Sequence, residues 1–185
     1  MSEGQLPPQP TNLTDIDRAL ILQQCELQQA TSPDEIDGFT RAYSRAKELA
    51  ATLDWDSFTP EDVLGLVMEL SKVTDPGKND RGFRIVPATF ASGNRALESD
   101  KIEQAMVGWS RAYSAGEVSA TELYREFELI HPFTDGNGRL GDLLWKMATQ
   151  RAEGTWPEVL PPDLFGENAA PKPQKYESAF GEIEE

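Results

Sequence analysis

The chain has 185 residues, a formal net charge of −15 and an isoelectric point near 4.4. Its length suits one domain with a substantial core, and its acidity argues against nucleic acid as a partner, because phosphate backbones are bound by clustered Lys and Arg. The single cysteine, Cys25, excludes an intrachain disulfide framework. The sequence has neither a run of about 18 apolar residues nor a basic segment followed by an apolar one at its start, so we expect a cytoplasmic protein that binds no membrane.

The N-terminal part of the chain predicts three helices behind a short lead. Residues 1–12 contain three prolines and are expected to form a flexible lead. A first helix is predicted from near Thr14 to near Thr31 by its apolar spacing. Ser32-Pro33 and Thr59-Pro60 open two more helices, because each joins a good N-cap residue to a proline in the first turn, with acids following at the positive end.

A β-rich run follows the third helix. Residues 82–90 read Gly-Phe-Arg-Ile-Val-Pro-Ala-Thr-Phe, and Pro87 within them argues against a central strand. We therefore expect an edge strand or a short β-hairpin around residues 82–92, lying on the helices, because a lone hairpin is not stable in water.

Three further helices and an acidic tail complete the prediction. They are expected from about Glu98 to Ser114, from a capping box at Ser119 to Ile130, and from about Gly138 to Ala152. Residues 153–185 are acidic and contain several prolines, so we expect little order there apart from a short docked segment around Tyr176 to Phe180. The predicted fold class is all-α, a helical bundle over residues 13–152 with one short hairpin.

The loop between the last two helices carries the chemistry. It runs from His131, the one histidine in the chain, to Arg139, and its glycines flank Asn137 at the start of an amphipathic helix. Closely spaced backbone amides and the positive end of a helix dipole favour an anion at this place.

The side chains of the loop suggest phosphate transfer. Asn137 can donate its amide to a phosphate, Arg139 can pair with a second phosphate, and Asp135 is a hard ligand for Mg²⁺. His131 can take a proton from an attacking hydroxyl. Taken singly, each residue has an ordinary structural explanation, such as a turn or a helix cap. Their grouping within nine residues favours a functional site.

The stretch His131-Pro132-Phe133-Thr134-Asp135-Gly136-Asn137-Gly138-Arg139 resembles the signature of the Fic family, which continues with two residues and a final Arg. A Gly-Phe-Arg segment at residues 82–84 is also similar, and the resemblance covers roughly Thr59 to Arg151. It implies a Fic-type helical bundle with a hairpin flap. It also implies transfer of AMP, or another nucleotide-derived group, from a Mg-nucleotide such as ATP to a Ser, Thr or Tyr hydroxyl of a target protein.

The resemblance implies a role for each matched residue. His131 would be the general base, Phe133 would anchor the loop, and Asp135 would bind Mg²⁺. The nucleotide-binding residues would be Gly136, Asn137, Gly138 and Arg139. Arg84, Ile85 and Val86 would form the flap that aligns the target chain by strand pairing.

The final Arg of the signature is replaced by Asp142, whose carboxylate would repel a triphosphate if it faced one. Asp142 is therefore a candidate for selecting a different donor. Alternatives to an active transferase are a weakened Fic-fold module that binds nucleotide or protein, and a Doc-like phosphotransferase. Residues 57–61 have the spacing of the family's inhibitory Ser/Thr-xxx-Glu motif but continue with Asp62, so any control through a regulatory partner stays open.

Overall fold

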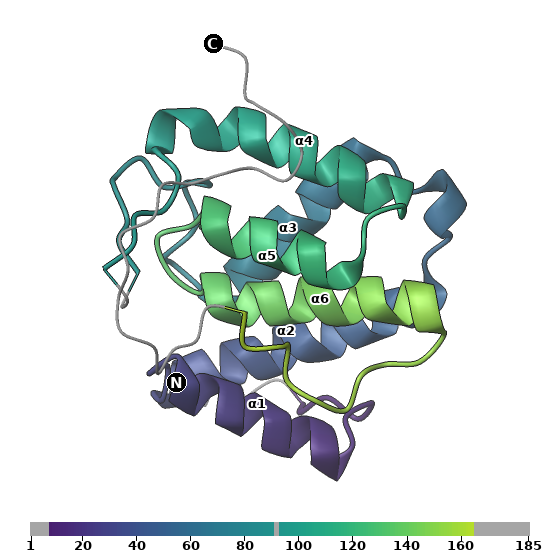
Figure 1. Ribbon diagram of the computed structural model, residues 1–185. Coiled ribbons are helices and arrows are strands. Elements are labelled where there is room, and N and C mark those ends of the chain that lie inside the picture. The colour runs from purple at the N-terminus through teal and green to yellow at the C-terminus, as the bar shows by residue number, and fades with distance from the viewer. Residues whose placement is uncertain (1–7, 91–92, 165–185) are drawn as a thin grey trace, which may run out of the picture.

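The computed structural model describes residues 8–90 and 93–164, which fold as a helical bundle (Figure 1). These ranges contain six α-helices and two single turns of 3-10 helix, which confirms the all-α prediction. The elements in chain order are α1 (Asp15–Leu27), α2 (Pro33–Thr52), η1 (Trp55–Ser57), α3 (Pro60–Thr74), η2 (Ser99–Lys101), α4 (Ile102–Ala115), α5 (Ala120–Ile130) and α6 (Asn137–Glu153). Within them, no helix combines the length and apolar character needed to cross a membrane.

Helix α6 lies at the centre of the bundle. It runs between α5 and α2 in Figure 1 and also packs on α3, while α1 covers the far side of α2. This placement explains why residues 137–149 of α6 are all buried, including charged ones. The loop that precedes α6 is therefore attached to a buried central helix of the fold.

Capping sets the N-terminal ends of the first three helices. The side chains of Thr14, Ser32 and Thr59 each accept a hydrogen bond from the backbone amide three residues on, and an acidic side chain returns the bond. Proline occupies the first turn of α2 and α3, as predicted. Helix α4 differs slightly from its prediction, because it is preceded by the 3-10 turn η2.

Helix α1 ends earlier than its apolar spacing predicted. Gln29 has a left-handed φ of 55°, and the amide of Ala30 donates back to the carbonyl of Cys25 at 2.8 Å. This pairing is typical of a Schellman ending, which closes the helix after Leu27. The ending brings Gln28 close to the start of α6.

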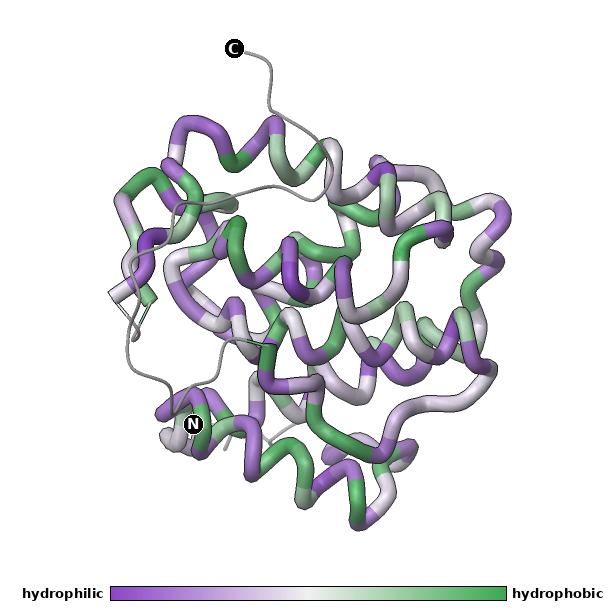
Figure 2. Tube along the Cα trace, viewed as in Figure 1, coloured by the Kyte–Doolittle hydropathy of each residue, from purple (hydrophilic) through white to green (hydrophobic). Residues whose placement is uncertain are grey.

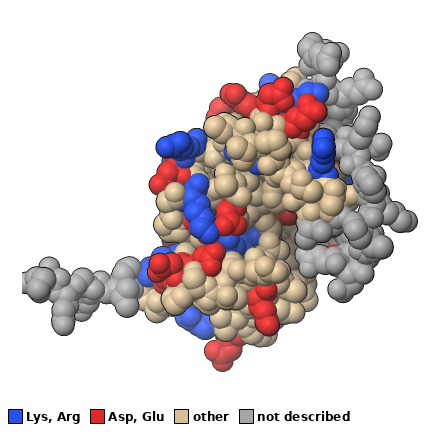
Figure 3. All heavy atoms as spheres, turned by 90° about the vertical axis from the view of Figure 1, so that its left-hand side faces the viewer, with Lys and Arg blue, Asp and Glu red and all other residues tan. Residues whose placement is uncertain are grey.

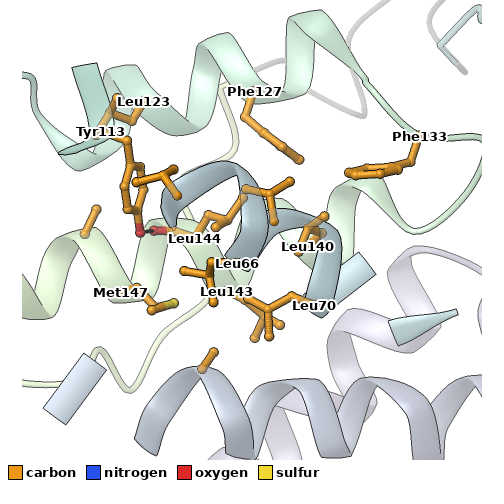
Figure 4. Packing of buried hydrophobic residues seen from close by; sticks show 14 of the residues in the cluster. Leu66, Leu70, Tyr113, Leu123, Phe127, Phe133, Leu140, Leu143, Leu144 and Met147 are labelled. Atoms are coloured by element: carbon orange, nitrogen blue, oxygen red, sulfur yellow. Dashed lines mark hydrogen bonds between the residues drawn. The ribbon is translucent and has the colours of Figure 1, made fainter. Parts of the chain in front are cut away.

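The core is formed by the apolar faces of the helices. Hydrophobic and hydrophilic residues alternate along α1 and α4 in Figure 2. The predicted face of α4 is buried, whereas in α1 Leu20 and Ile21 are buried but Ile16, Leu22 and Leu27 are exposed. Figure 4 shows the centre of this core, where Leu140, Leu143 and Leu144 meet residues of α3 and α5. The buried hydroxyl of Tyr113 donates to the Leu144 carbonyl at 2.9 Å, so its polar atom is satisfied.

The predicted β-hairpin is not formed in the described part of the chain. One isolated antiparallel bridge joins Thr89 to Arg95, and residues 82–87 form no strand. Two physical reasons are visible. Pro87 offers no amide to a ladder, and the amide of Arg84 is already bonded to the Pro132 carbonyl at 2.8 Å. The segment is thus tied to the loop before α6 instead of pairing with a strand.

The described start of the C-terminal tail packs on the bundle. The indole of Trp156 lies edge-on to Tyr43 at 5.4 Å and donates to its hydroxyl, while the carbonyl of Val159 accepts from Lys146 at 2.6 Å. The segment Tyr176 to Phe180, predicted to dock, lies outside the described residues, as does most of the predicted N-terminal lead.

Candidate active site

The loop between α5 and α6 turns at two residues with left-handed backbone. His131 caps α5 with a φ of 50°, and Gly136 caps α6 with a φ of 77°. Positive φ is uncommon for histidine, so its conformation must be held by its surroundings. The carbonyl of His131 accepts from Nε of Arg84 at 2.6 Å, and its amide donates to Phe127 at 2.9 Å.

Asn137 holds the loop closed. Its Oδ1 accepts from the amide of Phe133 at 2.9 Å, and its Nδ2 donates to the carbonyl of the same residue at 2.8 Å. The amide side chain predicted to bind phosphate is therefore engaged within the loop. The phenyl ring of Phe133 is fully buried, 5.5 Å from the ring of Phe83, and points into the core in Figure 4.

Backbone amides remain available for an anion. The first helical hydrogen bond of α6 runs from Leu140 to Gly136, so the amides of residues 137–139 have no partner within the helix. Together with the helix dipole, unpaired N–H groups at a helix start are an arrangement that favours an anion.

The glycines of the loop permit two close approaches. A Cβ on Gly136 would lie 2.6 Å from a carboxylate oxygen of Asp75, and a Cβ on Gly138 would overlap the side chain of Gln28. The carbonyl of Gly138 also accepts from Gln24 at 3.3 Å. Sequence reasoning missed these partners of the loop, because α1 and the end of α3 are far away in the chain.

Arg139 forms a buried ion pair. Its Nη2 lies 2.8 Å from Oδ2 of Asp75, and both side chains are almost completely buried. Burial raises the pKa of Asp75, and the charge of Arg139 opposes that rise. The prediction that Arg139 binds outer phosphates does not fit this arrangement, in which its guanidinium holds the end of α3 against the loop. In the sequence, Asp75 stands in an Asp-Pro-Gly run, which is typical of a turn and gives no sign of this ion pair.

Two other carboxylates and a lysine surround the predicted metal ligand, Asp135. Oxygens of Glu35, Asp75 and Asp135 lie within 4.8 Å of one another, and the ammonium of Lys78 contacts Asp135 at 2.7 Å and Glu35 at 3.2 Å. Burial of Asp135 would raise its pKa, but hydrogen bonds from Lys78 and the Gly136 amide outweigh this and lower it. A hydrogen bond from Ser32 is the main reason that the pKa of Glu35 falls to about 2. Such a set of hard oxygens suits Mg²⁺.

His131 is partly buried beside an aromatic ring. Its imidazole lies edge-on to Phe90 with ring centroids 5.0 Å apart. Burial lowers the pKa of His131 to about 4, and the positive charge of Arg84 adds to the effect. The imidazole is therefore neutral near pH 7 and can accept a proton.

Asp142 does not face the loop opening. It is fully buried and lies 2.7 Å from the ammonium of Lys146, which is also fully buried. Full burial raises the pKa of Asp142, and Lys146 opposes the rise. The predicted repulsion between Asp142 and a triphosphate needs a carboxylate that faces the phosphates, and the structure contradicts that premise.

The predicted flap residues separate into one buried and two exposed side chains. The guanidinium of Arg84 is buried and donates to carbonyls of Ile130, His131, Val86 and Leu97. It therefore joins this segment to the end of α5 and is not open to a target. Ile85 is 86% exposed and Val86 52% exposed, so both residues are open to solvent.

The chain matches a known protein family over the region that contains this loop. The model of the Fic/DOC family matches residues 57–147, from η1 through most of α6. Residues 57–147 of this chain thus form a Fic/DOC family domain. No curated protein matches the chain.

Solved structures show a similar fold. A Fic family protein from Desulfovibrio desulfuricans G20 has a TM-score of 0.54 at 18% sequence identity, over 77% of this chain and 52% of that one. A Fic domain containing signaling protein from Bacteroides thetaiotaomicron VPI-5482 has a TM-score of 0.49 at 17% identity, over 73% and 56% of the two chains. This chain thus spans just over half the length of each protein. The first of the two supports the helical fold and nothing finer.

Proposed function

We propose that this chain is a Fic-type transferase that moves AMP, or another nucleotide-derived phosphoryl group, to a Ser, Thr or Tyr hydroxyl of a target protein. The observation that carries the proposal is the loop itself. It presents a neutral His131, the carboxylate of Asp135 and the amides that open α6 within nine residues. Each of these elements supplies one requirement of phosphoryl transfer: a base, a metal ligand and an anion site.

The reaction proceeds by displacement at phosphorus. The target hydroxyl oxygen attacks the α-phosphorus, the hydroxyl proton passes to His131, and pyrophosphate leaves with the electrons of the broken P–O bond. The Nδ1 atom of His131 is fully buried, so only Nε2 can receive that proton. The amides of residues 137–139 stabilise the charge on the phosphoryl group.

Asp135 would hold Mg²⁺, with Asp75 and Glu35 close enough to support it. When bound, Mg²⁺ would neutralise charge on the phosphates of the donor. In the structure, Lys78 contacts the Asp135 carboxylate that would bind the ion, and the side chain of Asp135 is about half exposed. Binding of the ion therefore requires the ammonium to move.

A second candidate function is a binding module without transfer activity. Two observations favour it: Asn137 and Arg139 are engaged inside the protein, and the final Arg of the signature is replaced by the buried Asp142. His131 favours the enzyme, because a binding module has no use for a base at this place. Transfer of the γ-phosphoryl group, as in a Doc-like phosphotransferase, is the third alternative.

One labelling experiment separates these functions. The protein is incubated with Mg²⁺ and ATP labelled on the α- or the γ-phosphate, alone and with candidate targets, and the products are examined by intact-mass analysis. Transfer of the α-label, lost in His131→Ala, is the expected result. Transfer of the γ-label alone would indicate phosphotransfer. Nucleotide binding without transfer of either label would indicate a binding module.

A further inference from the structure

The loop needs a cation for the outer phosphates of a donor, and the signature residues do not supply one. Arg139 is buried against Asp75, and the position of the final Arg is occupied by Asp142, which is buried against Lys146. Arg84 is also buried and bonded to backbone carbonyls. None of these charges is open to a ligand at the start of α6.

Lys78 differs from these side chains in exposure and in contacts. Its side chain is 46% exposed, and its ammonium lies 2.7 Å from Oδ2 of Asp135. The other oxygen of the same carboxylate accepts from the Gly136 amide at 2.8 Å, so one carboxylate joins Lys78 to the anion site. Figure 3 shows the face that lies on the left of Figure 1, where acidic and basic side chains lie next to each other.

The backbone of Lys78 is fixed beside the loop. The neighbouring Asn79 is buried and donates from Nδ2 to the Asp135 carbonyl at 3.0 Å, and the amide of Lys78 donates to Asp75. The base of the lysine side chain is therefore held, while its four-carbon stem leaves the ammonium free to reorient.

The present contacts of Lys78 are exchangeable. Its ammonium is shared among Glu35, Asp135 and, at 3.8 Å, Asp75. Ion pairs with exposed members contribute little to stability, so the ammonium can leave them at low cost. A divalent cation that arrives with the donor would satisfy the same carboxylates and release the ammonium toward the phosphates beyond it.

We infer that Lys78 is the phosphate-binding cation of this site, taking the outer phosphates of the Mg-nucleotide in place of the final arginine of the signature. This inference rests on the proposed function, because it requires a nucleotide in the loop. It assigns the preference for a triphosphate over a monophosphate to a residue outside the signature loop.

The test compares affinities for ATP and AMP in the presence of Mg²⁺, measured by calorimetry and ligand-observed NMR on the full chain. In Lys78→Met the ratio of the AMP to the ATP dissociation constant is expected to fall about tenfold or more, since a charged hydrogen bond to the outer phosphates is lost. Lys78→Arg should restore most of the ratio. Arg81→Met is the matched control, because Arg81 is exposed in the same turn and makes no ion pair in the described part of the chain. Its ratio should equal that of the wild type.

The outcomes separate this inference from the proposed function. If the wild type binds Mg-ATP and Lys78→Met keeps the wild-type ratio, or binds ATP more tightly, Lys78 is not the phosphate-binding cation and the proposed function stands. If the wild type binds no nucleotide, both fail. Thermal melting of each variant shows that a changed ratio comes from folded protein.

Discussion

Asp142→Arg restores the arginine of the signature and is nevertheless expected to destabilise the protein. The substitution removes the partner of a fully buried ammonium and places a second positive charge beside it. Breaking one side of a buried ion pair costs about 3–5 kcal/mol, and the larger side chain adds about 1–3 kcal/mol of overpacking. The sum approaches the whole stability of many domains, which is about 5–15 kcal/mol.

The measurement is urea and thermal unfolding followed by far-UV circular dichroism. At this chain length each kcal/mol lowers the midpoint by about 2–4 °C, so the variant should melt at least roughly 10 °C below the wild type, or not fold. A matched control replaces both partners, as Asp142→Leu with Lys146→Met. It should stay within about 2 kcal/mol of the wild type, because an apolar pair of similar volume can replace a buried ion pair. The residual loss reflects the Val159 carbonyl, which Lys146 now satisfies.

An arginine variant that is as stable as the wild type and binds Mg-ATP more tightly would refute this reasoning. It would mean that residue 142 faces the nucleotide and that the contact with Lys146 is dispensable. Equal affinity for ATP in a stable variant would refute the stability argument alone.

Three further predictions concern the loop. His131→Ala should lower transfer by about two to four decades while leaving the melting temperature within a few degrees, and unchanged transfer would exclude His131 as the base. The pKa of His131 is about 4 in the folded protein, against the usual 6.5. Between these pH values the unfolded chain binds a proton at His131 that the folded chain does not, so the folded state loses stability as the pH falls from about 6.5 to 4. That loss is about 3 kcal/mol and should be missing in His131→Asn, so parallel stability curves for the two proteins over this range would contradict the shift. Gly136→Ala should lower the free energy of unfolding by at least about 1 kcal/mol, because φ is positive there and the new Cβ would contact Asp75. Gly154→Ala is the control, because φ is also positive but the space is open, and it should lower the free energy of unfolding by less. Urea unfolding measures both variants.

The sequence predicted correctly those helix ends that depend on residues adjacent in the chain. The starts of α2 and α3 follow from a cap residue and a proline that are adjacent in the chain, and the structure has both helices where these signals place them. The end of α1 was predicted too late, because Gln29 can adopt a left-handed backbone and no glycine marks the turn.

The strand expected over residues 82–87 does not form, because distant residues take its hydrogen bonds. Residues 82–90 have β propensity, but the amide of Arg84 bonds to Pro132 and its guanidinium to the end of α5. Propensity alone cannot show that a distant loop takes these hydrogen bonds first.

The site shows the same division between local and distant information. The signature loop could be found from nine consecutive residues, whereas the residues that surround it come from α1, α2 and the turn after α3. Asp75 lies 64 residues before Arg139, and Lys78 lies 57 residues before Asp135. An arginine beside glycines is equally suited to a phosphate and to a buried carboxylate, so the sequence could not decide between them.

The signature side chains in this protein mainly shape the loop, and this changes how their substitution should be interpreted. Asn137 closes the loop on Phe133, and Arg139 neutralises the buried Asp75, while the anion site itself consists of backbone amides. Loss of activity in Arg139→Ala would therefore not demonstrate a contact with phosphate, because the same change leaves an uncompensated carboxylate in the core. A phosphate contact is better tested at Lys78, because its removal leaves the buried Asp75 still paired with Arg139. The effect of that change on ATP and on AMP binding can be compared in the same folded protein.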